Sequence, residues 1–137
     1  MLNWSYIAGF FDGEGCAGIY KRKATTVCGR VQCGIAQSKI DILLEIKEFL
    51  LREGINSCIS SIAGGTSPKG ITRKRHHYLA MGDKHAVSFL AKVYPFLNVK
   101  RILVQDLLRY KIMYGRYPAK NILATDYHRQ RRAERGR

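Results

Sequence analysis

The stretch Tyr6-Ile7-Ala8-Gly9-Phe10-Phe11-Asp12-Gly13-Glu14-Gly15, near the start of the chain, organises the rest of this sequence. Gly9 and Gly13 stand four residues apart, so both fall on one side of a helix, where bare backbone lets another helix approach closely. Glu14 follows and places a carboxylate at the tip of that helix. The stretch therefore predicts an apolar helix that packs tightly on a partner and carries a candidate metal-binding acid. Its apolar residues recur at the i, i+3, i+4 spacing of one helical face, namely Ile7, Phe10 and Phe11.

Residues 7–15 resemble the nine-residue signature of the LAGLIDADG homing endonucleases, and Glu14 stands where that signature has its second, metal-binding acid. The sequence holds one copy of this motif. Two further segments, 35–39 and 95–100, fit the single-motif members of the family. The resemblance covers residues 1 to about 115. It implies an α+β fold with a saddle-shaped αββαββα core, in which an antiparallel β-sheet forms the DNA-binding face and helices pack behind it.

The patterning along the chain agrees with two helix-strand-strand units followed by two more helices. Alternation predicts strands, and apolar stripes at helical spacing predict helices. The expected strands span 16–24, 27–37, 55–63 and 71–81, and the expected helices end near Gly13, Gly54, Pro95 and Gly115. The expected N-terminal capping residues are Asn3 or Ser5, Ser38 with Asp41, Asp83 and Asn98.

The charge of the chain indicates its partner. Its 137 residues suit one domain, which we place at 1–117 and call the LAGLIDADG endonuclease domain, followed by a basic C-terminal tail at 118–137. The 24 Lys and Arg against 10 Asp and Glu give a net charge of +14. Such an excess indicates a polyanionic partner, namely nucleic acid. Basic surfaces also occur in ribosomal proteins, so a ribosome-associated protein stays as an alternative.

The cysteines and the hydropathy predict a cellular location. Cys16, Cys28, Cys33 and Cys58 lack the paired CxxC spacing of a zinc site, so we expect reduced thiols and no zinc. No apolar run approaches the length of a membrane span, about 20 residues, and no signal peptide opens the chain. We therefore expect a soluble intracellular protein without a membrane partner, in the cytoplasm of a prokaryote or in an organelle.

Residues that face outward from the predicted sheet are candidates for reading DNA. In the second strand, alternation turns Val31, Cys33 and Ile35 inward. In the fourth strand, analogy with the family places Tyr78 and Ala80 inward. The major groove admits a two-stranded ribbon, where Arg pairs with guanine and Gln with adenine. The predicted DNA-binding residues are Tyr20, Arg22, Arg30, Gln32, Arg73, Arg75 and His77.

The resemblance also implies roles for the residues of an active site. Glu14 and the backbone carbonyl of Gly15 would hold a divalent cation, Mg²⁺, which prefers oxygen ligands. Gln37 would orient the attacking water, and Lys100 would offset charge on the phosphate in the transition state. Asp12 is assigned to capping or support. Where some family members carry an arginine four residues after Gln37, this sequence has Asp41.

With one motif per chain, the resemblance implies a homodimer whose helices pack at Gly9 and Gly13 and bring both Glu14 carboxylates near the two-fold axis. The predicted function is an intron-encoded or intein-encoded homing endonuclease, a Mg²⁺-dependent hydrolase that cuts both DNA strands at a long pseudo-palindromic site. The alternative is a non-cleaving nucleic-acid-binding module on the same fold, either an RNA maturase or a DNA-binding regulator.

Overall fold

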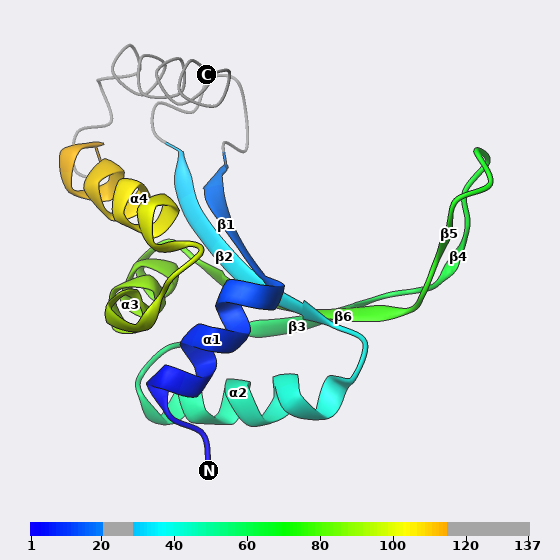
Figure 1. Cartoon of the computed structure of the whole chain (residues 1–137), viewed down its shortest axis with the longest axis horizontal. Helices are drawn as coiled ribbons and strands as arrows, with labels where there is room; N and C mark the ends of the chain where they lie inside the picture. The colour runs from blue at the N-terminus through cyan, green and yellow to red at the C-terminus, as the bar shows by residue number, and fades with distance from the viewer. Residues whose placement is uncertain (21–28, 115–137) are drawn as a thin grey trace.

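An antiparallel four-stranded sheet, in the order β1-β2-β6-β3, forms the centre of the computed structural model, which describes residues 1–20 and 29–114 (Figure 1). The predicted α+β architecture is confirmed. The elements are α1 (Trp4–Glu14), β1 (Gly15–Tyr20), β2 (Arg30–Gln37), α2 (Ile40–Arg52), β3 (Cys58–Ile62), β4 (Gly65–Thr66), β5 (Thr72–Arg73), β6 (His76–Gly82), α3 (Lys84–Val93), the 3-10 turn η1 (Tyr94–Phe96) and α4 (Arg101–Tyr114).

Helix α1 forms as its sequence predicts and ends abruptly. The side chain of Asn3 accepts a hydrogen bond from the backbone N–H of Tyr6 at 2.8 Å, which satisfies one free donor of the first turn. At the other end, β1 begins directly at Gly15. A Cβ atom there would lie 2.1 Å from the Phe11 ring and 2.5 Å from the Phe11 carbonyl oxygen, so the turn from helix to strand needs glycine. The buried residues of α1 are Ile7, Ala8 and Phe11.

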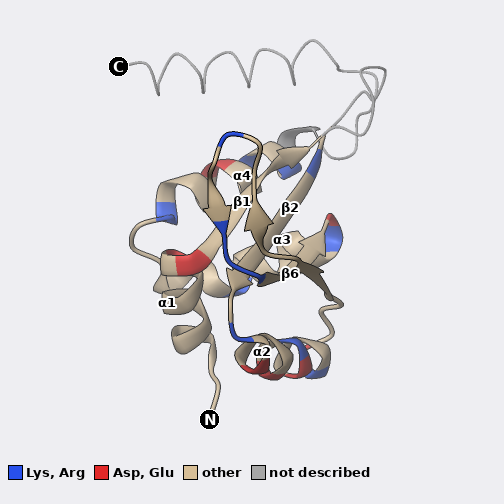
Figure 2. Ribbon diagram, turned by 90° about the vertical axis from the view of Figure 1, so that its right-hand side faces the viewer, with Lys and Arg blue, Asp and Glu red and all other residues tan. Residues whose placement is uncertain are grey.

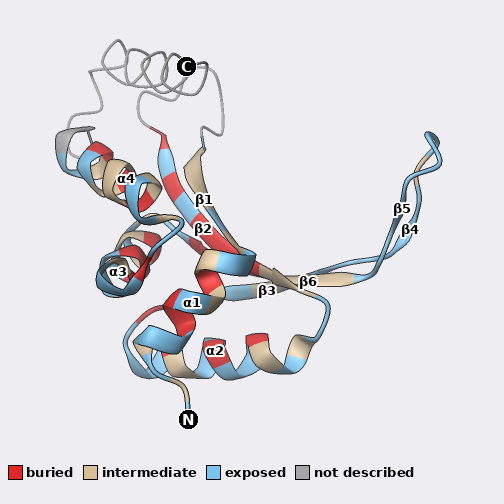
Figure 3. Cartoon of the chain, in the orientation of Figure 1, coloured by how far each residue is buried: buried red, intermediate tan, exposed pale blue. Residues whose placement is uncertain are grey.

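Strands β1 and β2 pair as an antiparallel hairpin, with Gly15 opposite Ile35 and Tyr20 opposite Arg30. Val31, Cys33 and Ile35 are buried, which confirms the alternation expected for β2. These side chains join the residues of the helices in one core between the sheet and α1 to α4, as the red segments of Figure 3 show.

The orientation expected for β6 was wrong. Leu79 and Met81 are buried, so they face the core, and Tyr78 and Ala80 point to the outer face of the sheet. Both alternating sets of residues in β6 are apolar in this part of the strand. The set that enters the core, Leu79 and Met81, has no hydroxyl group that would need a hydrogen-bond partner there. His77, which we expected outward, shares its parity with Leu79, and its ring bonds the hydroxyl of Ser61 at 2.6 Å.

The single strand expected at 71–81 is divided in two. Its first part, β5, pairs with β4 in a separate two-stranded ribbon that projects from the body of the molecule (Figure 1). The backbone N–H of Gly70 donates to the carbonyl of Ser67, and Gly70 adopts φ of 79°, which closes the ribbon with a glycine turn. Arg73 lies in this ribbon and Arg75 between the ribbon and β6.

The predicted starts of α2 and α3 lie close to the observed ones, but the side chains predicted to cap these two helices make no cap hydrogen bond. Asp83 immediately precedes α3, makes no cap hydrogen bond and pairs instead with the Lys111 amine on α4. Ser38 donates to the side chain of Gln37, and α2 begins at Ile40 without a side-chain cap. The stop predicted at Gly54 is confirmed, since α2 ends at Arg52 and Gly54 has φ of 78°. No helix in the described part of the chain is long and apolar enough to cross a membrane.

Candidate nucleic-acid interface and active site

The outward face of α1 is bare at both glycines. A Cβ atom added to Gly9 or to Gly13 would meet nothing within 4 Å, so this side of the helix faces open space. Tyr6 and Phe10 stand on the same helix with their rings stacked at 6.3 Å, and Tyr6 is 49% exposed. An apolar helix that is neither covered nor charged along this face is suited to packing on another helix.

Glu14 is the last residue of α1 and is exposed. The acidic end of the helix is red in Figure 2. Glu14 makes no ion pair with any residue that the structure describes. An exposed carboxylate suits Mg²⁺, which keeps several waters in its coordination sphere. Within the described residues no group of three His, Cys, Asp or Glu side chains could hold a metal ion.

Asp12 connects the end of α1 to the segment before α4. Its carboxylate accepts hydrogen bonds from the backbone N–H groups of Asn98 at 2.7 Å and Lys100 at 2.9 Å. Burial opposes the ionisation of this carboxylate. The backbone donors of Asn98, Lys100 and Val99 outweigh that effect and lower the pKa of Asp12 below its usual value. The support role expected for Asp12 thus takes a specific form, in which it caps the chain that leads into α4.

Lys100 lies at the end of α1 that carries Glu14. Its amine donates to the backbone carbonyl of Asp12 at 2.6 Å and stands 5.8 Å from the centroid of the Phe11 ring. With Asn98 as the expected cap, Lys100 would lie in the first turn of a helix, where a cation is disfavoured, but α4 begins at Arg101. The amine instead meets the negative end of α1, where a cation is favoured. The position of Lys100 therefore needs no bound anion to explain it.

Gln37 ends β2 opposite His77 and shares the parity of the buried Ile35, so it lies on the same face of the sheet as His77, at the end of the strand. Its Oε1 accepts hydrogen bonds from the backbone N–H of Ser38 at 2.8 Å and from the Ser38 hydroxyl at 3.1 Å. These bonds use the oxygen of the carboxamide and fix its orientation. The NH₂ group remains as the donor that Gln37 can offer to a ligand.

The predicted DNA-binding residues lie in separate places. Tyr20, Arg30 and Gln32 share the outer face at the hairpin end of β1 and β2, with Tyr20 directly opposite Arg30. Arg73 and Arg75 belong to the exposed ribbon region, which includes no Asp or Glu between residues 56 and 82. His77 points to the other face, as described above. Arg22 lies outside the described residues.

The outer face of the large sheet is only partly basic. Among the described strands of the large sheet, Arg30 is the only Lys or Arg that points outward. The other cations of this region belong to the ribbon and its flanks, namely Lys69, Arg73, Lys74 and Arg75. The middle of the face is instead neutral, which the sequence did not lead us to expect. Gly34 within β2 was the available signal, because a strand glycine often marks the close approach of another group.

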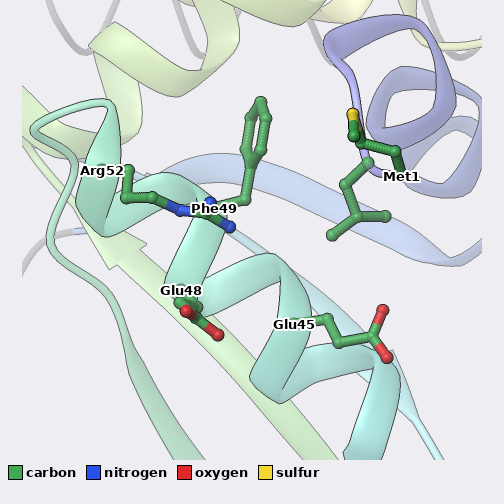
Figure 4. A pocket seen from close by; sticks show the side chains of 6 residues that line it. Met1, Glu45, Glu48, Phe49 and Arg52 are labelled. Atoms are coloured by element: carbon green, nitrogen blue, oxygen red, sulfur yellow. The ribbon is translucent and has the colours of Figure 1, made fainter.

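A pocket of about 390 Å³ opens between the start of the chain and α2 (Figure 4). Its charged lining combines Glu45 and Glu48 with Arg52, so it suits no polyanion. It lies beside the N-terminal residues Met1 and Leu2, whereas Glu14 occupies the opposite end of α1. The pocket is therefore separate from the candidate active site.

Comparison with known proteins gives a consistent result. A family model described as a LAGLIDADG-like domain matches residues 3–94. A structure of the homing endonuclease I-CvuI with the I-CreI target superposes with a TM-score of 0.60 at 22% identity, covering 88% of this chain and 72% of that one. The homing endonuclease I-TnaI gives 0.62 at 19%, with 92% and 85% covered. I-SmaMI bound to cleaved DNA gives 0.64 at 14%, with 91% and 42% covered. No curated protein sequence matches the chain.

Proposed function

Because this chain belongs to the family of LAGLIDADG-like domains, we propose that it is a site-specific double-strand DNA endonuclease that works as a homodimer. The observation that carries the proposal is the exposed Glu14 at the end of a helix whose outward face is bare at Gly9 and Gly13. Solved structures of the same fold include I-CvuI in complex with a DNA target. The fold would position the DNA, and the residues at the end of α1 would carry out the cleavage.

The bare face of α1 supports the proposed homodimer. Two α1 helices that meet at Gly9 and Gly13 could approach with their backbones nearly in contact, because neither glycine has a side chain in the way. Such packing would also cover part of Tyr6, which is 49% exposed in the single chain. It would bring the two Glu14 carboxylates together near the two-fold axis. Two like charges at short range repel, which favours a cation between them.

Glu14 and the carbonyl of Gly15 are the groups that would hold the divalent cation, Mg²⁺. When bound, the metal would activate a water for attack on phosphorus and stabilise the departing 3′ oxygen. Glu14 suits this role because it is exposed and makes no ion pair with a described residue. Gly15 suits it because the helix ends there, which leaves its carbonyl outside the helical hydrogen-bond ladder.

Two further residues complete the proposed active site. The Lys100 amine uses one donor on the Asp12 carbonyl, and an ammonium has three, so two stay available for a phosphate oxygen. The Gln37 carboxamide is oriented through its oxygen by Ser38, and its NH₂ group can position a water or a phosphate. Both residues are therefore oriented by the chain before any substrate binds, which lowers the cost of organising the transition state.

The outer face of β1 and β2 would lie in the major groove. Arg30 can pair with guanine and Gln32 with adenine, with Tyr20 beside them. Arg73 and Arg75 would extend the contact along the duplex through the ribbon. His77 is omitted from this set because it points to the other face. Arg22 remains a prediction from the sequence.

The test compares binding and cleavage in the same variant. Glu14→Gln should bind the target duplex as tightly as the unmodified chain and lose Mg²⁺-dependent cleavage. Glu53→Gln, at the end of α2, is the matched control and should cleave normally. A target is first selected by incubating the chain with a randomised duplex library in Mg²⁺ or EDTA and sequencing the ends. Normal cleavage by Glu14→Gln would contradict the active-site assignment, and binding without cleavage by the unmodified chain would favour a non-cleaving module.

A further inference from the structure

The neutral middle of the outer face has one large side chain that the proposed function does not use. Tyr78 on β6 extends across β2 toward β1, and its hydroxyl lies 3.1 Å from Sγ of Cys16. A Cβ atom on Gly34 would come within 2.5 Å of the Tyr78 ring, so the ring rests directly on the backbone of β2. Tyr78 is thus held over the sheet by a bare glycine beneath it and a thiol at its tip.

We propose that Tyr78, held by Cys16, determines specificity for the DNA base pairs next to the cleavage position. This inference rests on the proposed endonuclease function. It assigns the middle of the interface to an aromatic contact in place of the cationic contacts used further out.

The placement follows from strand register. Cys16 is two residues after Glu14 and one after Gly15, where β1 leaves the proposed metal site. At about 3.3 Å per residue, Cys16 is only a few ångströms along the strand from that site. Because the Tyr78 hydroxyl meets Cys16, the tip of Tyr78 belongs to the same short stretch of interface. DNA bound with its scissile phosphate at Glu14 would present the neighbouring base pairs to this ring.

Among the outward residues of its own row and of the row of Cys16, Tyr78 has the largest side chain. In the row of Cys16 the other outward residues across the sheet are Gly34, Ala80 and Cys58, and in its own row they are Ala36 and Ser60. None of these carries a charge or a long side chain. A base edge that approaches this part of the sheet therefore meets the ring of Tyr78, with the ring of Tyr20 over Gly18 beside it.

The chemistry of Tyr78 suits the edge of a base. The ring can make apolar contact with the methyl group of thymine, and the hydroxyl can donate to an acceptor such as N7 or O4. Burial, together with the hydrogen bond to Cys16, raises the pKa of Tyr78 above its usual value. The hydroxyl is therefore protonated at neutral pH, and it can donate this one proton to a base while the Cys16 thiol donates to the hydroxyl oxygen.

The first experiment measures base preference. Binding of Tyr78→Ala and Tyr78→Phe to a duplex library, randomised across the whole target, is compared with that of the unmodified chain. Tyr78→Ala should change the preference near the two-fold axis by about fivefold, the size of one lost contact, and leave the outer positions unchanged. Tyr78→Phe should keep any preference for thymine that comes from apolar contact with the ring. It should lose only the base preference that depends on a hydrogen bond from the hydroxyl. Equal preferences for Tyr78→Ala and the unmodified chain, with both folded by thermal unfolding, would overturn the inference.

The second experiment locates the DNA. In a chain with Cys28→Ser and Cys58→Ser, Cys16 is exposed while Cys33 is 1% exposed and serves as the internal control. N-ethylmaleimide is added in EDTA buffer with and without target duplex, and labelled peptides are counted by mass spectrometry. At a duplex concentration about ten times Kd, labelling of Cys16 should slow about tenfold. Unchanged labelling on a bound duplex would overturn the inference.

The two proposals fail in different ways. A chain that binds no duplex at all would overturn both. A chain that binds and cleaves DNA, and whose Arg30→Ala variant loses preference at an outer position, would support the endonuclease. If Tyr78→Ala then left every preference intact, only the present inference would be overturned.

Discussion

The Asp12 carboxylate accepts a hydrogen bond from the backbone N–H of Lys100 at 2.9 Å, and the Lys100 amine donates in return to the Asp12 carbonyl at 2.6 Å. This reciprocal pair joins the end of α1 to the segment that begins α4, across 88 residues of sequence. Because Asp12 lies two residues before Glu14, this pair holds the Lys100 amine near the end of α1. Folding itself therefore assembles part of the proposed active site.

Removing the Asp12 carboxylate should loosen this connection. Asp12→Ala leaves the N–H groups of Asn98 and Lys100 without their acceptor, which should cost about 1 to 3 kcal/mol in the free energy of unfolding. Asp12→Asn keeps one acceptor oxygen and should cost less. Urea unfolding followed by circular dichroism measures both. Equal stability of Asp12→Ala and the unmodified chain would show that the bonds contribute nothing in solution.

The same bonds predict a pH dependence. The pKa of Asp12 is lower in the folded chain than in the unfolded chain, because its ionised form accepts the backbone bonds. Its contribution to stability is therefore complete above the unfolded pKa, near pH 4, and is lost as the pH falls through the folded pKa. The stability difference between the unmodified chain and Asp12→Asn should shrink between about pH 5 and pH 2. A difference that stays constant over this range would exclude the charge as its source.

Association should respond to bulk at the exposed glycines. In the single chain nothing lies within 4 Å of a Cβ added at Gly9 or Gly13, so Gly13→Leu should leave the fold of the single chain intact. It should separate the two α1 helices and convert a dimer to a monomer on gel filtration. Gly15→Ala is the contrasting variant, since its Cβ would overlap Phe11 within one chain and should destabilise the fold itself. A dimer that persists in Gly13→Leu would contradict the packing of α1 on α1.

Substitution of Arg30 should change the base preference of binding, whereas substitution of a cation elsewhere on the surface should not. Arg30→Ala should cost about 1 to 3 kcal/mol at one base pair in each half-site. Arg52→Ala, on α2 beside the pocket, should leave binding unchanged. Quantitative sequencing of bound duplexes measures preference at every position at once. Uniform weakening across all sequences would mean that Arg30 contacts phosphate only.

The charge of the ribbon should set the salt dependence of binding. Arg73→Ala should reduce the slope of log K against log salt by about one if this side chain neutralises a phosphate. Lys84→Ala, an exposed cation at the start of α3, is the control and should leave the slope unchanged. Binding titrations at several salt concentrations give the slope. An unchanged slope for Arg73→Ala would place the ribbon outside the phosphate contact.

The sequence by itself determined the helices and strands that depend only on residues close together in the chain. The spacing of Ile7, Phe10 and Phe11 defined α1, and the strict alternation about Val31 and Cys33 oriented β2, because helical and strand periods are read directly from neighbouring residues. Tertiary structure alone decided the rest. The parity of β6 depends on which apolar pair fits the core, Leu79 and Met81 or Tyr78 and Ala80. The partners of Asp12, Asp83 and Tyr78 come from distant segments, and no local pattern encodes which distant N–H, amine or thiol will meet a side chain once the elements have packed.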